Sequence, residues 1–202
     1  MTARANSPIS WGSNVGAGYF TNPLEFVIST VFSLYVLVLM LRFLLAWVRA
    51  DFYNPVSQFL VKVTNPILVP LRRVIPPLGG IDFASVVAML AVQMLAIALI
   101  LLLRGGGIGA QALIFISLAE LTDLAFKVFI YGIVIQALLS WINPGTYNPA
   151  VNLLHALTEP VLRPVRRLLP PISGMDLSPL LAILALEVVR RLVVPLLGAL
   201  AA

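Results

Sequence analysis

The chain has no cysteine and only one histidine, His155, among its 202 residues. Without cysteine it cannot form disulfides, thiolate metal sites, covalent c-type haem attachments or a cysteine nucleophile. With one histidine it cannot by itself build a histidine-rich metal site or a bis-histidine haem site. We therefore expect no cofactor and no metal, and we expect His155 to be an interfacial side chain without a catalytic role.

Charged residues are also scarce, at 10% of the chain, against roughly 25% in soluble domains. Hydrophobic residues make up 60%, and the mean hydropathy is +1.03. Too few polar side chains remain to cover a surface in water, so lipid must cover part of it. The net charge of +5, from 13 Lys and Arg against 8 Asp and Glu, favours an anionic membrane leaflet over nucleic acid as the nearby polyanion.

Four apolar stretches, residues 24–48, 83–103, 118–142 and 177–200, are long enough to cross about 30 Å of hydrocarbon as helices. Four segments cannot close a β-barrel, so the predicted fold is an all-α membrane protein with four transmembrane helices. Residues 1–22 lack the features of a signal peptide, and we expect a flexible tail before an uncleaved first span. Residues 104–117, which begin with Arg104 and three glycines, are predicted to be a linker.

The second half of the chain repeats the first after a shift of 94 positions. Between residues 47 and 91, 18 of 45 positions are identical to their counterparts, without a gap. Matched pairs include Trp47 and Trp141, Tyr53 and Tyr147, Asn54 and Asn148, Pro55 and Pro149, Gly80 and Gly174, and Asp82 and Asp176. We therefore divide the chain into repeat unit 1, residues 23–103, and repeat unit 2, residues 118–202, with two spans each.

Because each unit crosses the membrane twice, both units enter from the same side and the repeats run parallel. The segments between the spans hold seven basic residues, whereas the opposite side shows only Arg4 and Arg104 outside a span. The positive-inside rule then predicts both inter-span segments in the cytoplasm and both termini on the outer side. Trp47 and Trp141 lie where the first span of each unit emerges, the usual depth of an aromatic anchor.

The inter-span segments read as amphipathic helices. Asn54 is a candidate N-cap followed by Pro55 at the first helical position, and Asn148 and Pro149 repeat the pattern. Val56, Phe59, Leu60 and Val63 form an expected apolar stripe, and Ile67, Leu68, Leu71 and Val74 form a second one. The sequences Thr-Asn-Pro at 64–66 and Thr-Glu-Pro at 158–160 are predicted to separate each segment into a pair of short helices.

Gly80 allows a turn after the first pair, and Asp82 or Ser178 can cap the next span. Each pair lies in the headgroup layer or re-enters the bilayer as a loop.

Basic residues accompany these helices: Lys62, Arg72, Arg73, Arg166 and Arg167. Either the helices only pack against the ends of the bundle, or the paired arginines of both units make one basic surface for anionic lipid or an acidic partner. Arg42, near the end of the first span, is expected to snorkel to the cytoplasmic headgroups.

These segments resemble the YggT family, also called YlmG-like, of bacterial and plastid membrane proteins. The resemblance lies in Asp-Phe-Tyr-Asn-Pro at 51–55, Thr-Asn-Pro at 64–66, Pro-Leu-Arg-Arg at 70–73, Ile-Pro-Pro at 75–77 and Gly-Ile-Asp-Phe at 80–83. The second copy departs from it with Asn-Pro-Gly at 143–145 and with Glu159 in place of Asn65. The resemblance implies a multi-pass protein of the bacterial inner membrane, with links to osmotic-stress tolerance, cell division, cytochrome assembly and nucleoid organisation. It brings no catalytic residues.

Ionisable residues inside the spans are the remaining candidates. Glu187 lies midway along the last span, at the position that Gln93 holds in the second, and Arg190 and Arg191 follow one turn later. A similar set, Glu120, Asp123 and Lys127, lies near the outer end of the third span. An intramembrane carboxylate indicates either a functional site or an ion pair that packs helices or contacts another chain.

Two functions follow. The first is a non-enzymatic scaffold or assembly factor in the cell envelope, with membrane lipids and either a second copy or another membrane protein as partners. The second is an oligomeric ion or small-solute channel that uses Glu187. No nucleophile with a base at helical spacing is present, so we expect no enzyme activity.

Overall fold

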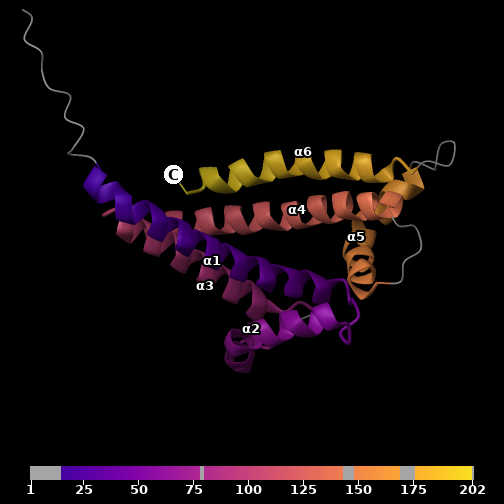
Figure 1. Cartoon of the computed structure of the whole chain (residues 1–202), viewed down its shortest axis with the longest axis horizontal. Coiled ribbons are helices and arrows are strands. Elements are labelled where there is room, and N and C mark those ends of the chain that lie inside the picture. The colour runs from indigo at the N-terminus through magenta and orange to yellow at the C-terminus, as the bar shows by residue number, and fades with distance from the viewer. Residues whose placement is uncertain (1–14, 78–79, 143–147, 169–175, 202) are drawn as a thin grey trace, which may run out of the picture.

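The computed structural model describes residues 15–77, 80–142, 148–168 and 176–201; the side chains of residues 15–21 and Trp141 are not part of this description. Regular structure in these ranges consists of six helices and no strands (Figure 1). They are α1 (Val15–Trp47), α2 (Pro55–Val74), α3 (Phe83–Leu103), α4 (Ala110–Ile142), α5 (Pro149–Leu168) and α6 (Ser178–Ala199). The prediction of an all-helical chain is confirmed.

Two of the described helical stretches, Asn22–Trp47 and Phe83–Leu103, are long and apolar enough to cross a membrane. They are the first two predicted spans. The last two, in α4 and α6, carry three charged side chains each and stay predictions.

The helices form two antiparallel hairpins with a third helix at the turn of each (Figure 1). α1 packs against α3, α4 packs against α6, and the hairpins meet along α3 and α4. α2 and α5 lie toward one end, while the start of α1, the α3–α4 connection and the end of α6 lie at the other. At that second end Arg104 pairs with Glu25 at 2.7 Å, and the amide of Gln111 donates to the carbonyl of Leu200 at 3.4 Å.

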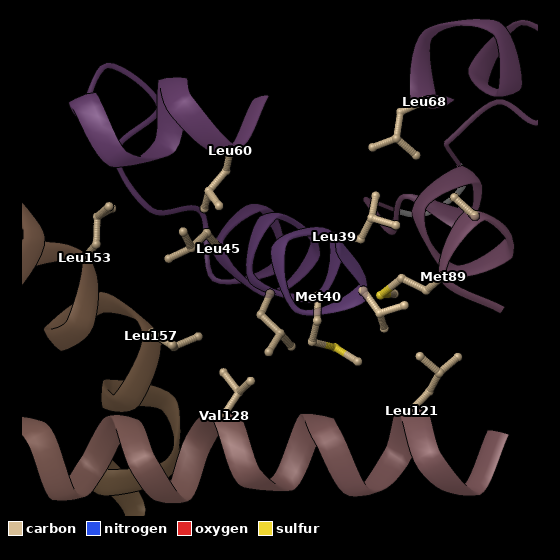
Figure 2. Packing of buried hydrophobic residues seen from close by; sticks show 13 residues of the cluster. Leu39, Met40, Leu45, Leu60, Leu68, Met89, Leu121, Val128, Leu153 and Leu157 are labelled. Atoms are coloured by element: carbon tan, nitrogen blue, oxygen red, sulfur yellow. The ribbon is translucent and has the colours of Figure 1, made fainter. Parts of the chain in front are cut away.

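The largest core is centred on α1, with α2, α3, α4 and α5 around it (Figure 2). Leu39, fully buried, lies among side chains from these neighbouring helices. The shared core residues include Met40 and Leu45 of α1, Leu60 and Leu68 of α2, Met89 of α3, Leu121 and Val128 of α4, and Leu153 and Leu157 of α5. Because α5 of the second half reaches α1 of the first, the two halves share one core.

Each inter-span segment is one 20-residue helix, and the predicted pairs of short helices are wrong. Pro66 and Pro70 lie inside α2, and Pro160 and Pro164 lie inside α5. A proline removes one backbone hydrogen bond and bends a helix, and Figure 1 shows α2 and α5 changing direction along their length. Buried residues on both sides of the first proline, such as Leu60 and Leu68 in α2, hold each helix together against the bundle.

The buried face of α2 also differs from the predicted stripe. Ser57 and Thr64 are buried with Leu60 and Leu68, whereas Val56 and Phe59 are exposed. The hydroxyl groups are satisfied inside the protein: Ser57 donates to the carbonyl of Asp51 at 2.9 Å, and Thr64 donates to the carbonyl of Leu60 at 2.7 Å. Buried polar groups are tolerated when they are bonded in this way.

Helix boundaries differ from the prediction at three places. α1 begins at Val15, inside the predicted tail, and α4 begins at Ala110, inside the predicted linker, because the apolar sequence that continues from Ala110 extends the helix. At the start of α6 Ser178 is the first helical residue, and the carboxylate of Asp176 accepts its backbone N–H at 2.9 Å. The turn predicted at Gly80 is present, with φ of +83°.

Candidate functional site

The starts of α2 and α5 are capped alike and touch each other. The side chain of Asn54 accepts the backbone N–H of Val56 at 2.9 Å, and Asn148 accepts that of Ala150 at 2.9 Å. The amide of Asn54 also donates to the carbonyl of Pro149 at 2.6 Å. The repeated Asn-Pro sequence therefore starts both helices and joins them at their N-terminal ends.

A buried polar contact ties each of these helices to the first long helix of its unit. In unit 1 the Arg42 guanidinium of α1 donates to the hydroxyl of Thr64 in α2. In unit 2 Gln136 of α4 accepts from the hydroxyl of Thr158 in α5. Arg42 and Gln136 are each 8% exposed, and both threonines are fully buried. Arg42 and Gln136 lie 94 positions apart, and so do the two threonines. The repeat therefore preserves the position of the contact, but only unit 1 has a charge there.

Arg42 does not snorkel to the headgroups, and that prediction is wrong. Besides Thr64 it donates to the carbonyl of Val61 at 3.4 Å and to the side chain of Asn65 at 3.0 Å. These neutral oxygens compensate the desolvation of the guanidinium. Among the described ion pairs none involves Arg42, so α2 solvates a buried positive charge by hydrogen bonds alone.

A second contact ties the far end of each helix to the next long helix. Arg72 in the last turn of α2 pairs with Asp82, directly before α3. Arg166 in the last turn of α5 pairs with Asp176 at 3.1 Å, and also with Glu159 at 3.0 Å. Two of the four predicted surface arginines are therefore structural.

The pKa values of these two aspartates reflect the pairs. Burial alone would raise the pKa of Asp82, but hydrogen bonds from Arg72 and Ser85 outweigh burial and hold this pKa below its ordinary value. Burial opposes ionisation of Asp176 as well, and hydrogen bonds from Ser178 and Arg166 nevertheless lower its pKa. Both carboxylates are thus stabilised in the charged form.

The remaining basic side chains of α2 and α5 are exposed: Lys62, Arg73, Arg163 and Arg167. None of the four takes part in an ion pair with another described residue. The structure does not bring the two arginine pairs together: α2 and α5 meet at their first turns, run in different directions from there (Figure 1), and carry the arginines in their last turns. The predicted single basic surface is therefore two separate basic ends.

The other repeated residues are distributed over the same end of the molecule. Trp47, at the end of α1, and Tyr53 are 53% and 87% exposed, as an interfacial position requires. Tyr147, Gly174 and the side chain of Trp141 lie outside the described residues.

The intramembrane candidates form one network across α4 and α6. Arg190 pairs with Glu187 at 2.7 Å and with Asp123 at 2.5 Å. Arg191 also pairs with Glu187 at 2.7 Å, and Lys127 pairs with Asp123 at 2.6 Å. The Arg190–Asp123 bridge between helices was not predicted, because residue spacing reveals only pairs within one helix.

Gln93 of α3, which holds in unit 1 the position of Glu187, donates to the carboxylate of Glu120 in α4. Glu120 lies one turn before Asp123 on α4, so α4 and α6 together carry three acidic and three basic side chains. Equal numbers of opposite charges lower the cost of placing such a set in hydrocarbon. This arrangement favours the interpretation of Glu187 as a helix-packing residue.

No group of three or more potential metal ligands occurs in the part of the chain that the structure describes, and His155 is exposed there on α5.

These features define an all-helical protein with two helices suited to a membrane and with amphipathic, arginine-bearing helices between its long helices. The profile of the CCB3/YggT family matches twice, at residues 21–103 and 115–197. An uncharacterised protein of Pseudomonas aeruginosa is 47% identical over 84% of this chain and 87% of its own length. The uncharacterised protein YggT of Escherichia coli K12 is 44% identical over 84% of this chain and 88% of its own length. The chain belongs to the CCB3/YggT family. No solved structure matches it.

Proposed function

We propose that this protein is a non-enzymatic scaffold or assembly factor that crosses the bacterial inner membrane four times. α2 and α5 form a platform on the cytoplasmic side, and their exposed cations bind an acidic membrane-protein partner. The observation that supports this most is the pair of helices joined at their first turns on one end of the bundle, with Arg73 and Arg167 outside the structural ion pairs. The family resemblance relates such a role to osmotic-stress tolerance, cell division or nucleoid organisation.

Crosslinking in native membranes, followed by identification of the captured proteins, tests this function. The variant Arg73→Gln with Arg167→Gln removes both exposed charges and keeps the pairs of Arg72 and Arg166. We expect it to lose the partner that the wild type captures, whereas the matched variant Arg73→Lys with Arg167→Lys retains it. Equal capture by the glutamine variant at equal membrane insertion contradicts the proposal.

A channel that uses Glu187 has less support. A proton or cation carrier needs a carboxylate that is available to the moving ion, and this carboxylate binds two arginines.

A further inference from the structure

A groove of about 470 Å³ runs between α2 and α3 in the first unit. Ile67, Pro70, Leu71 and Val74 line it from α2, and five residues between Val87 and Leu95 line it from α3. Two of these five are alanines, and their small side chains leave the space open. All nine lining residues are apolar, so the groove suits a hydrocarbon chain.

The groove has a defined position along α3. Its α3 wall begins one turn after Phe83, the first residue of that helix, and extends over eight residue steps, or about 12 Å at 1.5 Å per residue. α3 is one of the two helices that are long and apolar enough to cross a membrane. An occupant of the groove therefore lies beside the membrane-spanning wall, starting near its end.

Positive charge lies at that same end. Arg72 is held at the start of α3 by Asp82. Arg73 is exposed, takes part in no ion pair with a described residue, and directly precedes Val74, the last groove residue of α2. A cation at the headgroup end of an apolar groove complements a ligand with one anionic end and one hydrocarbon end.

We propose that this groove binds one anionic phospholipid, with an acyl chain along α3 from Val87 to Leu95 and the phosphate at Arg73. The site refines the proposed function, on which it rests: Arg73 holds a lipid at the basic end of α2, and the exposed cations Lys62, Arg163 and Arg167 remain for the acidic partner. The lipid fixes α2 against α3 at the membrane surface and leaves α5 with its own basic end.

Native mass spectrometry of the full-length protein in detergent, with phosphatidylglycerol or phosphatidylcholine added, tests the site. The wild type should retain one phosphatidylglycerol per chain and less phosphatidylcholine. Arg73→Gln should reduce phosphatidylglycerol retention about five-fold, the equivalent of about 1 kcal/mol for one cation at a membrane surface, and Arg73→Lys should not. Equal retention of the two lipids, or no effect of Arg73→Gln, overturns the proposal.

A second set of variants fills the groove without touching a charge. Ala91→Phe places a ring in the α3 wall at an exposed position, and Val87→Phe does so one turn earlier. Displacing two methylene groups from apolar contact already reduces affinity about tenfold, so each variant should lose phosphatidylglycerol by at least that factor. Ala185→Phe, at the same position of the second unit, is the matched control and should retain it.

Full retention in both filled variants, or an equal loss in Ala185→Phe, overturns the assignment to this groove. The assignment is also overturned if the wild type is a dimer and Ala91→Phe is a monomer, because the groove would then be an interface between two copies. The filled variants keep Arg73 and Arg167, so loss of lipid with unchanged partner capture separates this site from the proposed scaffold function.

Discussion

At the scale of single residues, a buried polar contact holds each amphipathic helix to the bundle. The two contacts join equivalent positions, with Arg42 in unit 1 and Gln136 in unit 2, but they differ in charge and direction: Arg42 donates to Thr64, whereas Gln136 accepts from Thr158. A cation that is 8% exposed depends more strongly on its acceptors than a neutral amide oxygen depends on its donor. The threonine of unit 1 should therefore contribute more to stability than the threonine of unit 2.

Replacing Thr64 by Val keeps the shape of the side chain and removes the acceptor of Arg42. We expect a loss of about 2–3 kcal/mol in the free energy of unfolding, whereas Thr158→Val should lose about 1 kcal/mol. Denaturant unfolding of both variants in detergent measures the difference. Equal losses, or a larger loss for Thr158→Val, would show that the charge of Arg42 is not supported by Thr64.

The sequence contains a signal for this contact that a periodicity analysis does not use. Arg42 and Gln136 are polar residues in apolar stretches, lie 94 positions apart, and precede threonines that are also 94 positions apart. The burial of Arg42 could not be predicted, because an arginine near the end of a span has two solutions, headgroups or an internal acceptor, and only packing selects one.

At the scale of the helical element, polar contacts hold α2 to its neighbours at both ends and in the middle. The Asn54 cap joins it to α5, Thr64 joins it to α1, and Arg72 joins it to Asp82 before α3. α5 has the corresponding Arg166–Asp176 pair, but its aspartate side chain is 40% exposed against 13% for Asp82. The pair in unit 1 is thus less screened by solvent.

Asp82→Asn should therefore destabilise the protein by about 1–2 kcal/mol at neutral pH, and Asp176→Asn by less than about 1 kcal/mol. The pKa of Asp82 in the folded state lies below its ordinary value of 3.8. The contribution of this group is complete above 3.8 and is lost as the pH falls through the folded-state pKa. On acidification the free energy of unfolding of the wild type should therefore fall to that of Asp82→Asn. A difference that is independent of pH in denaturant unfolding contradicts the assignment.

The sequence predicted where helices form, but it did not predict that α2 and α5 continue across their prolines. The boundaries of α3 agree with the predicted second span, since an uncharged and largely apolar stretch between Asp82 and Arg104 has clear ends. The prolines of α2 and α5 suggested two short helices in each segment, because local propensity alone favours a break at Pro66. Contacts of Leu60 and Leu68 with the core outweigh that preference.

At the scale of the whole molecule, the repeat predicted that the two inter-span segments share one face, and α2 and α5 lie toward one end of the bundle. It did not predict how the segments are oriented within that face. α2 and α5 contact each other at their first turns, where Asn54 bonds to Pro149, and their arginine-bearing ends point in different directions (Figure 1). The result is a platform with two basic ends rather than one basic patch.

The proposed topology has both amphipathic helices on the cytoplasmic side and the α3–α4 connection on the outer side. The absence of cysteine makes this directly measurable, because single-cysteine variants have no background. Lys62→Cys in α2, His155→Cys in α5 and Gly107→Cys in the connection all lie at exposed positions. With a membrane-impermeant maleimide, we expect Gly107→Cys to react in intact cells, and the other two to react only after permeabilisation. Reaction of Lys62→Cys or His155→Cys in intact cells, or of Gly107→Cys only after permeabilisation, would contradict this topology.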